Sequence, residues 1–283
     1  MSALHIPGLV DVLTVEEPEE IRRLSEHPAL DRVAEGGPLA VRLLRTRLAR
    51  TLRSPDGPLP SAMPRDSAER EKLRKDLFAQ LADPDLAERL EEPVAKTAAY
   101  VSGKPGRAGP LAQTLFGRVF VPNFVATDSS WNAAQVIGRA AGAPTPISMW
   151  EAITGQRTAA QASLSQVMKG DRNGVHAIGV AVHNFVLTLE RLRRLDKSTG
   201  TEEALAKSIL APERVARSGV ISVETVAGGV RKSTFVLLST RKAATKTLDR
   251  RLAFLTDAWS GCPAHDFVPA LTERIWRAAQ EQA

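Results

Sequence analysis

Cys262, the one cysteine of the chain, is the side chain with the clearest chemical potential. It lies in WSGCPAHDF, where Pro263 suits the first position of a helix and would put Cys262 at or beside the helix N-cap. The unpaired N–H groups and the positive end of the helix dipole at that place favour an anionic sulfur. A lowered thiol pKa would make Cys262 a nucleophile or a metal ligand; the alternative is an inert buried thiol.

His265 is the nearest partner that could share such chemistry with Cys262. At i, i+3 the two residues supply half of a zinc site, and no second pair follows at matching spacing. A Cys–His nucleophile would also need an orienting residue and an oxyanion loop, and no motif marks either. The cysteine therefore has to be interpreted together with more distant segments.

Two histidines and an asparagine interrupt the most apolar segment, 174–195, GVHAIGVAVHNFVLTLERLRRL. Its first four turns are nearly all apolar, which predicts a central helix that is buried all round. His176 and His183 are about 10 Å apart along that helix, too far to hold one ion together. His183 and Asn184 could therefore take part in a reaction. The alternative is that they form hydrogen bonds with buried backbone groups.

Arginines are concentrated on two predicted helices. Arg70 and Arg74 share a face of a helix that begins near Asp66, which suits either an anion or a surface ladder of ion pairs with neighbouring glutamates. The segment 41–53, VRLLRTRLARTLR, predicts a basic amphipathic helix. Its arginines form either a solvated face over a leucine stripe or a docking face for an acidic protein, an anionic lipid surface or RNA.

The remaining pattern is helical with a minor β component, so the predicted fold class is mainly α with a small β-sheet. Helical periodicity continues from Pro18 to about Tyr100, is interrupted by the Gly/Pro-rich linker 102–110, and returns with proline breaks in 111–168. The other predicted elements are a helix at 202–210, strands at 220–226 and 233–240, and a last helix from Pro263 to Gln280.

The order of these late elements resembles the C-terminal third of the cytochrome P450 family of heme-thiolate enzymes. The matching blocks are EEALA (202–206), APERVARSG (211–219), VETVAGGV (223–230), STFVLLS (233–239) and AFLTDAWSGCPAHDF (253–267). CPAHDF is similar to the C-P-[GA] start of the family's last helix. Further back, HAIGVAVHNFV (176–186) looks like the oxygen-binding helix, and PRDSAEREKLRKDLF (64–78) looks like the helix that holds a heme propionate.

The resemblance implies one reduced P450-like helical domain at 1–283 that binds heme b through Cys262. Within it, 1–110 would hold the N-terminal helices, 111–170 a reduced lid, and 171–283 the central helix, small sheet and cysteine loop. It also implies that Arg70, Arg74 and Arg217 hold the propionates. The short chain implies the loss of lid helices and of the N-terminal sheet.

The sequence departs from the family at places that bear on the reaction. Ala206 stands where the family's E-x-x-R motif has its arginine. The family's A-G-x-[DE]-T motif would fall on 181–185, where the acid and alcohol are replaced by Asn184 and Phe185. The resemblance implies that Ala181, at the start of this motif, would contact the heme. A branch that rearranges hydroperoxides lacks the threonine and uses an asparagine there. The resemblance thus implies catalytic roles for Asn184 and His183 on a fatty-acid-like hydroperoxide.

Three functions follow from the resemblance. The first is O–O cleavage, rearrangement or peroxygenase chemistry on an organic hydroperoxide, with a hydrophobic substrate and a peroxide-producing enzyme as a partner. The second is a monooxygenase fed by an acidic redox partner that docks on 41–53. The third is a non-catalytic binding protein that has lost heme.

Composition sets the remaining expectations. The chain has 283 residues and a net charge of +6, an excess too modest to imply nucleic-acid binding. Its start lacks the basic and apolar regions of a signal peptide, and no segment suits a membrane span. A lone cysteine agrees with a reducing compartment, so we expect a cytoplasmic protein.

Overall fold

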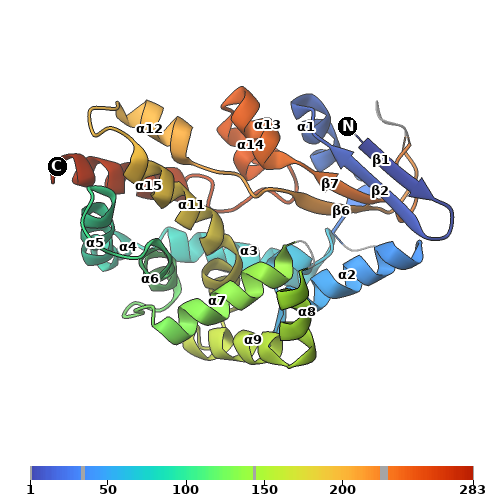
Figure 1. Ribbon diagram of the computed structural model, residues 1–283, viewed down its shortest axis with the longest axis horizontal. Helices are drawn as coiled ribbons and strands as arrows, with labels where there is room; N and C mark the ends of the chain where they lie inside the picture. The colour runs from blue at the N-terminus through green and yellow to red at the C-terminus, as the bar shows by residue number, and fades with distance from the viewer. Residues whose placement is uncertain (1, 33–35, 143–144, 224–228, 283) are drawn as a thin grey trace. The chain divides into compact units, whose positions relative to one another are not determined.

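The computed structural model describes residues 2–32, 36–142, 145–223 and 229–282. These residues form many helices and a small mixed sheet, which confirms the predicted fold class (Figure 1). Among them, no helix is long and apolar enough to cross a membrane. The chain divides into two compact units, each assembled from segments that are distant in sequence.

The first unit comprises residues 1–50, 61–70 and 210–265 and contains a five-stranded sheet of order β1-β2-β7-β6-β3. The strands are β1 (Ser2–Ile6), β2 (Val10–Val15), β3 (Leu30–Asp31), β6 (Val215–Gly219) and β7 (Phe235–Leu238). β2 and β7 run parallel, with Val12 opposite Phe235, and the other neighbours are antiparallel. The sheet therefore joins the two ends of the sequence.

Helices cover one face of this sheet in the first unit (Figure 1). They are α1 (Pro18–Glu26), α13 (Thr240–Thr247) and α14 (Arg250–Phe254), and the unit also contains nearly all of α2 (Leu39–Thr51). Leu13 and Val236 of the sheet pack with Ile21 and Leu24 of α1 in a closed apolar core. Alternation along the strands supplies the inward-facing side chains of this core.

Two predictions about the sheet need correction. The N-terminal sheet is present, because β1 and β2 form an antiparallel hairpin that joins β7. The partner of the 233–240 strand is β6 at Val215–Gly219, and 220–223 contributes one bridge, from Val223 to Val230. The rest of the predicted strand, 224–226, lies outside the described residues.

The second unit comprises 51–60, 71–209 and 266–283 and is helical apart from the short pair β4 (Arg53–Ser54) and β5 (Gly57–Pro58). Its helices are most of α3 (Ala68–Leu81), α4 (Leu86–Arg89), α5 (Glu91–Val101), α6 (Ala108–Phe120), α7 (Asp128–Ala141), α8 (Pro146–Ile153), α9 (Gln156–Val167), α10 (Arg172–His176), α11 (Val182–Arg194), α12 (Thr201–Ser208) and α15 (Phe267–Gln280). The predicted subdivision of a single domain at residues 110 and 170 stays a prediction.

The predicted central helix forms the core of this unit as α10, a π-helical turn at Ala177–Ala181, and α11. No residue from 171 to 186 is exposed. Phe185 of α11 packs against Phe116 of α6, with ring centroids 5.0 Å apart. The apolar sequence thus forms a buried helix, as predicted.

Candidate functional site

Cys262 ends a tightly folded loop that follows α14 in the first unit. The backbone N–H of Cys262 donates to the carbonyl of Phe254 at 2.8 Å, and Gly261 N–H donates to Ala258 at 2.8 Å. A Cβ on Gly261 would lie 2.6 Å from the carbonyl oxygen of Leu255, so this position admits only glycine without rearrangement. These bonds fix the backbone on which the partly exposed cysteine stands.

The predicted helix N-cap at Cys262 is wrong. The helix begins at Phe267, because the chain first makes a turn in which His265 N–H donates to the Cys262 carbonyl at 3.2 Å. His265 Nδ1 also lies 2.9 Å from that oxygen. The helix dipole therefore does not account for a thiolate at Cys262, since its effect is confined to the first turn.

Four guanidinium groups surround the ring of Trp259, three residues before the cysteine. The distances from Cζ to the ring centroid are 4.7 Å for Arg70, 5.3 Å for Arg32, 5.6 Å for Arg217 and 5.7 Å for Arg65. All five residues belong to the first unit. We call them the Arg–Trp cluster.

Hydrogen bonds tie the Arg–Trp cluster to the cysteine loop. Arg70 Nη2 donates to the Trp259 carbonyl at 2.7 Å, and Arg32 Nη2 donates to the Ser260 carbonyl at 3.3 Å. Arg217 Nη2 donates to Ser260 Oγ, and its Nη1 donates to the Ala216 carbonyl at 2.8 Å. The loop and the arginines therefore form one connected structure.

Three buried donors of the cluster have no hydrogen-bond partner: Arg65 Nη1, Arg217 Nε and Trp259 Nε1. Unpaired buried donors are costly and rare in native proteins, and a bound ligand that supplies the acceptor is one explanation for them. Guanidinium forks match the geometry of carboxylates and phosphates. The donor set thus fits a ligand that carries negatively charged oxygens.

The electrostatics of Arg217 support that interpretation. This side chain is 3% exposed, and burial is the main reason why its pKa falls to about 10. The charge of Asp31 raises this pKa, and the charge of Arg70 lowers it further. The positive charge is therefore held in an unfavourable environment that an anionic ligand would improve.

The structure brings together two of the three arginines predicted to hold an anion. Arg70 and Arg217 both stack on Trp259, whereas Arg74 belongs to the second unit and stacks on Phe78, 5.1 Å from the ring centroid. Sequence reasoning missed Arg32, Arg65 and Trp259. The signal for Trp259 was its place in the cysteine loop, where its indole offers a donor and a stacking face.

His183 in the second unit is held by α7. Its Nε2 lies 2.9 Å from the Ala134 carbonyl, and its ring lies 5.6 Å from that of Trp131. Burial is the main cause of its lowered pKa, against the opposing effect of the Ala134 hydrogen bond. The ring is accordingly neutral and donates from Nε2, since the carbonyl can only accept.

Ala181 and Asn184 lie where the central helix changes its winding. Ala181 is the last residue of the π-helical turn, and Asn184 lies in the first turn of α11. Asn184 is half-buried, and its carbonyl accepts from Thr188 Oγ1 at 3.2 Å. Single π-helical turns are frequent at functional sites, so this segment is the second candidate region.

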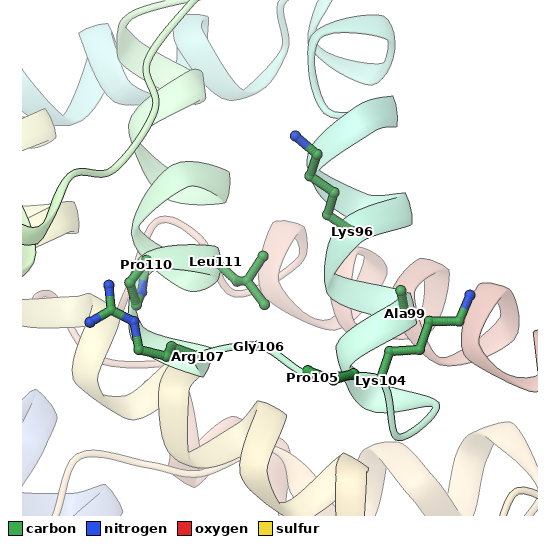
Figure 2. A pocket seen from close by; sticks show the side chains of 8 residues that line it. All are labelled: Lys96, Ala99, Lys104, Pro105, Gly106, Arg107, Pro110 and Leu111. Carbon is green, nitrogen blue, oxygen red and sulfur yellow. The ribbon is translucent and has the colours of Figure 1, made fainter.

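A cavity of about 410 Å³ lies between α5 and α6 in the second unit (Figure 2). The loop from Lys104 to Arg107 closes one end, in the segment predicted as a linker. Lys96 pairs with Glu92, and Arg107 pairs with Asp128. Two of the three lining cations therefore already have carboxylate partners, and no lining residue has a buried unpaired donor like those of the Arg–Trp cluster.

Comparison with solved structures defines the class of fold. CYP175A1 from Thermus thermophilus matches with a TM-score of 0.64 and 14% identity over 96% of this chain and 82% of that chain. CYP154A1 from Streptomyces coelicolor matches with a TM-score of 0.63 and 14% identity over 99% and 85%. CYP152N1 with myristic acid matches with a TM-score of 0.57 and 12% identity over 95% and 80%.

These neighbours are cytochromes P450, and the chain has their fold. No family model matches the sequence, and no curated protein matches it at a significant level. The chain is therefore a strongly divergent example of this fold.

Proposed function

We propose that the chain is a heme-thiolate protein in which the Cys262 thiolate would ligate the iron of heme b. The observation that carries the proposal is the Arg–Trp cluster. One of its three unpaired buried donors, Trp259 Nε1, lies in the loop of the one cysteine, and the other two belong to arginines that stack on Trp259, in a chain with the cytochrome P450 fold. Heme carries two carboxylates, which match cationic donors of this kind.

In this proposal the cluster binds the heme carboxylates. Arg65 Nη1, Arg217 Nε and Trp259 Nε1 donate to carboxylate oxygens, and Arg70 contributes charge from beneath the indole ring. Pairing would raise the pKa of Arg217 again, because a nearby negative charge favours the charged guanidinium. Arg74 remains a proposed partner of a carboxylate on the grounds of the family resemblance alone.

We further propose that the substrate is an organic hydroperoxide, fatty-acid-like on the grounds of the family resemblance. Heme iron with an axial thiolate supplies electron density that favours O–O cleavage. On the grounds of the family resemblance alone, Asn184 is the proposed amide that hydrogen-bonds the peroxide, and Ala181 is a proposed heme-binding residue. His183 has the proposed task of holding this segment against α7 through Ala134. The myristic acid in the CYP152N1 structure supports a fatty-acid-like substrate.

The test is spectroscopic and uses the purified full chain. Wild type should take up one equivalent of hemin, and its ferrous–CO complex should absorb at the position typical of thiolate ligation. Cys262→Ser should lose that absorption. A wild-type chain that does not bind hemin would overturn the proposal. An unchanged spectrum in Cys262→Ser would show that another residue ligates the iron.

The reaction is tested separately from heme binding. Wild type should convert a fatty-acid hydroperoxide without any reductant, and Asn184→Ala should lower turnover at least tenfold while leaving the CO spectrum intact. Asn184→Gln is the matched control, because it keeps the amide. Heme binding without turnover of any hydroperoxide would support a non-catalytic role instead.

A partner-dependent monooxygenase is the second candidate. It is favoured by α2, which has no acidic residue and exposes Arg42 and Arg50. Arg45 is not available for docking, because it donates to Ser218 Oγ at 2.9 Å and to the Ser233 carbonyl at 2.6 Å. Substrate-dependent consumption of NADPH with a ferredoxin and its reductase would favour this candidate over the hydroperoxide reaction.

A further inference from the structure

Helix α8 in the second unit has its polar and apolar faces reversed. The residues that it buries are polar: Ser148 and Glu151 are each 4% exposed. The residues that it exposes are large and apolar: Ile147 (62%), Met149 (58%), Trp150 (63%) and Ile153 (79%). A helix that packs on a protein core normally shows the opposite arrangement, so the exposed face needs a partner.

Specific bonds hold α8 in this orientation. Thr145 and Ser148 form a reciprocal capping box, and Pro146 occupies the first turn. Glu151 Oε1 accepts from Arg139 Nε at 3.0 Å and from Nη2 of the same side chain at 2.5 Å. Turning the apolar face inward would break this ion pair between α8 and α7. The reversed orientation is therefore fixed by the second unit itself.

The charges in the sequence on either side of α8 restrict what its partner can be. Glu151 is the one carboxylate in the sequence from 129 to 170, and it is buried against Arg139. The same stretch contains two further cations, Arg157 and Lys169. The segment thus presents an apolar face and no exposed carboxylate, which suits an anionic surface.

We propose that α8 inserts its apolar face into the interfacial layer of an anionic phospholipid bilayer. Eight residues of helix are about 12 Å long, which is far too short to span but sufficient to lie in the interface. Four exposed apolar side chains are far fewer than the roughly 20–30 residues that each partner contributes to a stable protein interface, so a second copy is a poorer fit. Trp150 is suited to the headgroup boundary, where one end of the indole is apolar and the other is hydrated.

The test is sedimentation of the full chain with vesicles of phosphatidylglycerol and phosphatidylcholine. Wild type should sediment with these vesicles, and brominated acyl chains should quench its tryptophan fluorescence. The double variant Trp150→Glu, Ile153→Glu should lower the partition coefficient at least tenfold. Val125→Glu is the control, because Val125 is also apolar, 61% exposed and in the second unit; it should change partitioning less than twofold.

The inference would be overturned if the wild-type chain stayed in the supernatant or if the double variant sedimented as wild type does. It would also be overturned if Val125→Glu lowered vesicle binding as much as the double variant. A wild-type dimer that the double variant dissociates, without vesicle binding, would assign the face to a second copy. Vesicle binding does not require heme, so this result and the hemin titration succeed or fail independently.

Discussion

Replacing Arg217 by Met separates ligand binding from folding. A pKa that burial lowers from 12.5 to about 10 corresponds to about 3 kcal/mol by which the folded heme-free protein disfavours this charge. The variant removes that cost. It also removes hydrogen bonds to Ala216 and Ser260, worth about 1 kcal/mol each, and the stacking on Trp259, worth about 1 kcal/mol.

These contributions nearly cancel, so the free energy of unfolding of heme-free Arg217→Met should lie within about 1 kcal/mol of the wild-type value. Its affinity for hemin should nevertheless fall, because a charge-assisted hydrogen bond to a carboxylate is worth about 1.5–3 kcal/mol. That range corresponds to a roughly ten- to hundredfold increase in Kd. Urea denaturation measures the first quantity, and a spectroscopic hemin titration measures the second.

Arg42→Met is the matched control, because Arg42 is exposed on α2 in the same unit. It should change neither quantity. An Arg217→Met variant that binds hemin as tightly as wild type would refute the role of the Arg–Trp cluster. If Arg217→Met lost more than 3 kcal/mol of unfolding free energy, the buried charge would stabilise the heme-free protein, which contradicts the cost of burial calculated above.

Three further predictions concern single positions. Tyr100, the one tyrosine, should titrate near pH 12 in an absorbance experiment, because burial and the hydrogen bond to Glu190 raise its pKa to about 12. Its contribution to the free energy of unfolding should be complete below pH 10 and lost between pH 10 and 12. Gly261→Ala should cost about 1–3 kcal/mol in urea denaturation, since the new Cβ meets the Leu255 carbonyl, and an unchanged midpoint would contradict this. Glu151→Gln should accelerate proteolysis at α8, because it removes the charge that pairs with Arg139.

Helices were predictable where a local pattern determines them. The apolar run at 174–195 became the buried α10, π-helical turn and α11, and the basic segment became α2. The start of the last helix was placed too early, because Pro263 is equally compatible with a turn. The His265–Cys262 hydrogen bond, which decides between the two, is not visible in composition.

The Arg–Trp cluster was only partly predictable, since its members come from distant parts of the sequence. Arg70 and Trp259 are 189 positions apart, and Arg217 and Ser260 are 43 apart. Helical spacing singled out Arg70 and Arg74 as a pair, but only Arg70 stacks on Trp259. Which arginines meet is determined by the tertiary fold of the first unit.

The pairing of β2 with β7 also has a consequence for biosynthesis. Val12 lies opposite Phe235, so the inner edge of the β1–β2 hairpin has no strand partner until β7 has been made. At typical translation rates, roughly 10–40 s separate the synthesis of the two strands. During that interval the hairpin presents an open strand edge together with Leu4 and Ile6, which remain exposed even in the folded chain. Until β7 has been made, the hairpin therefore presents an edge that can pair with other chains, and chaperone binding during synthesis would protect it.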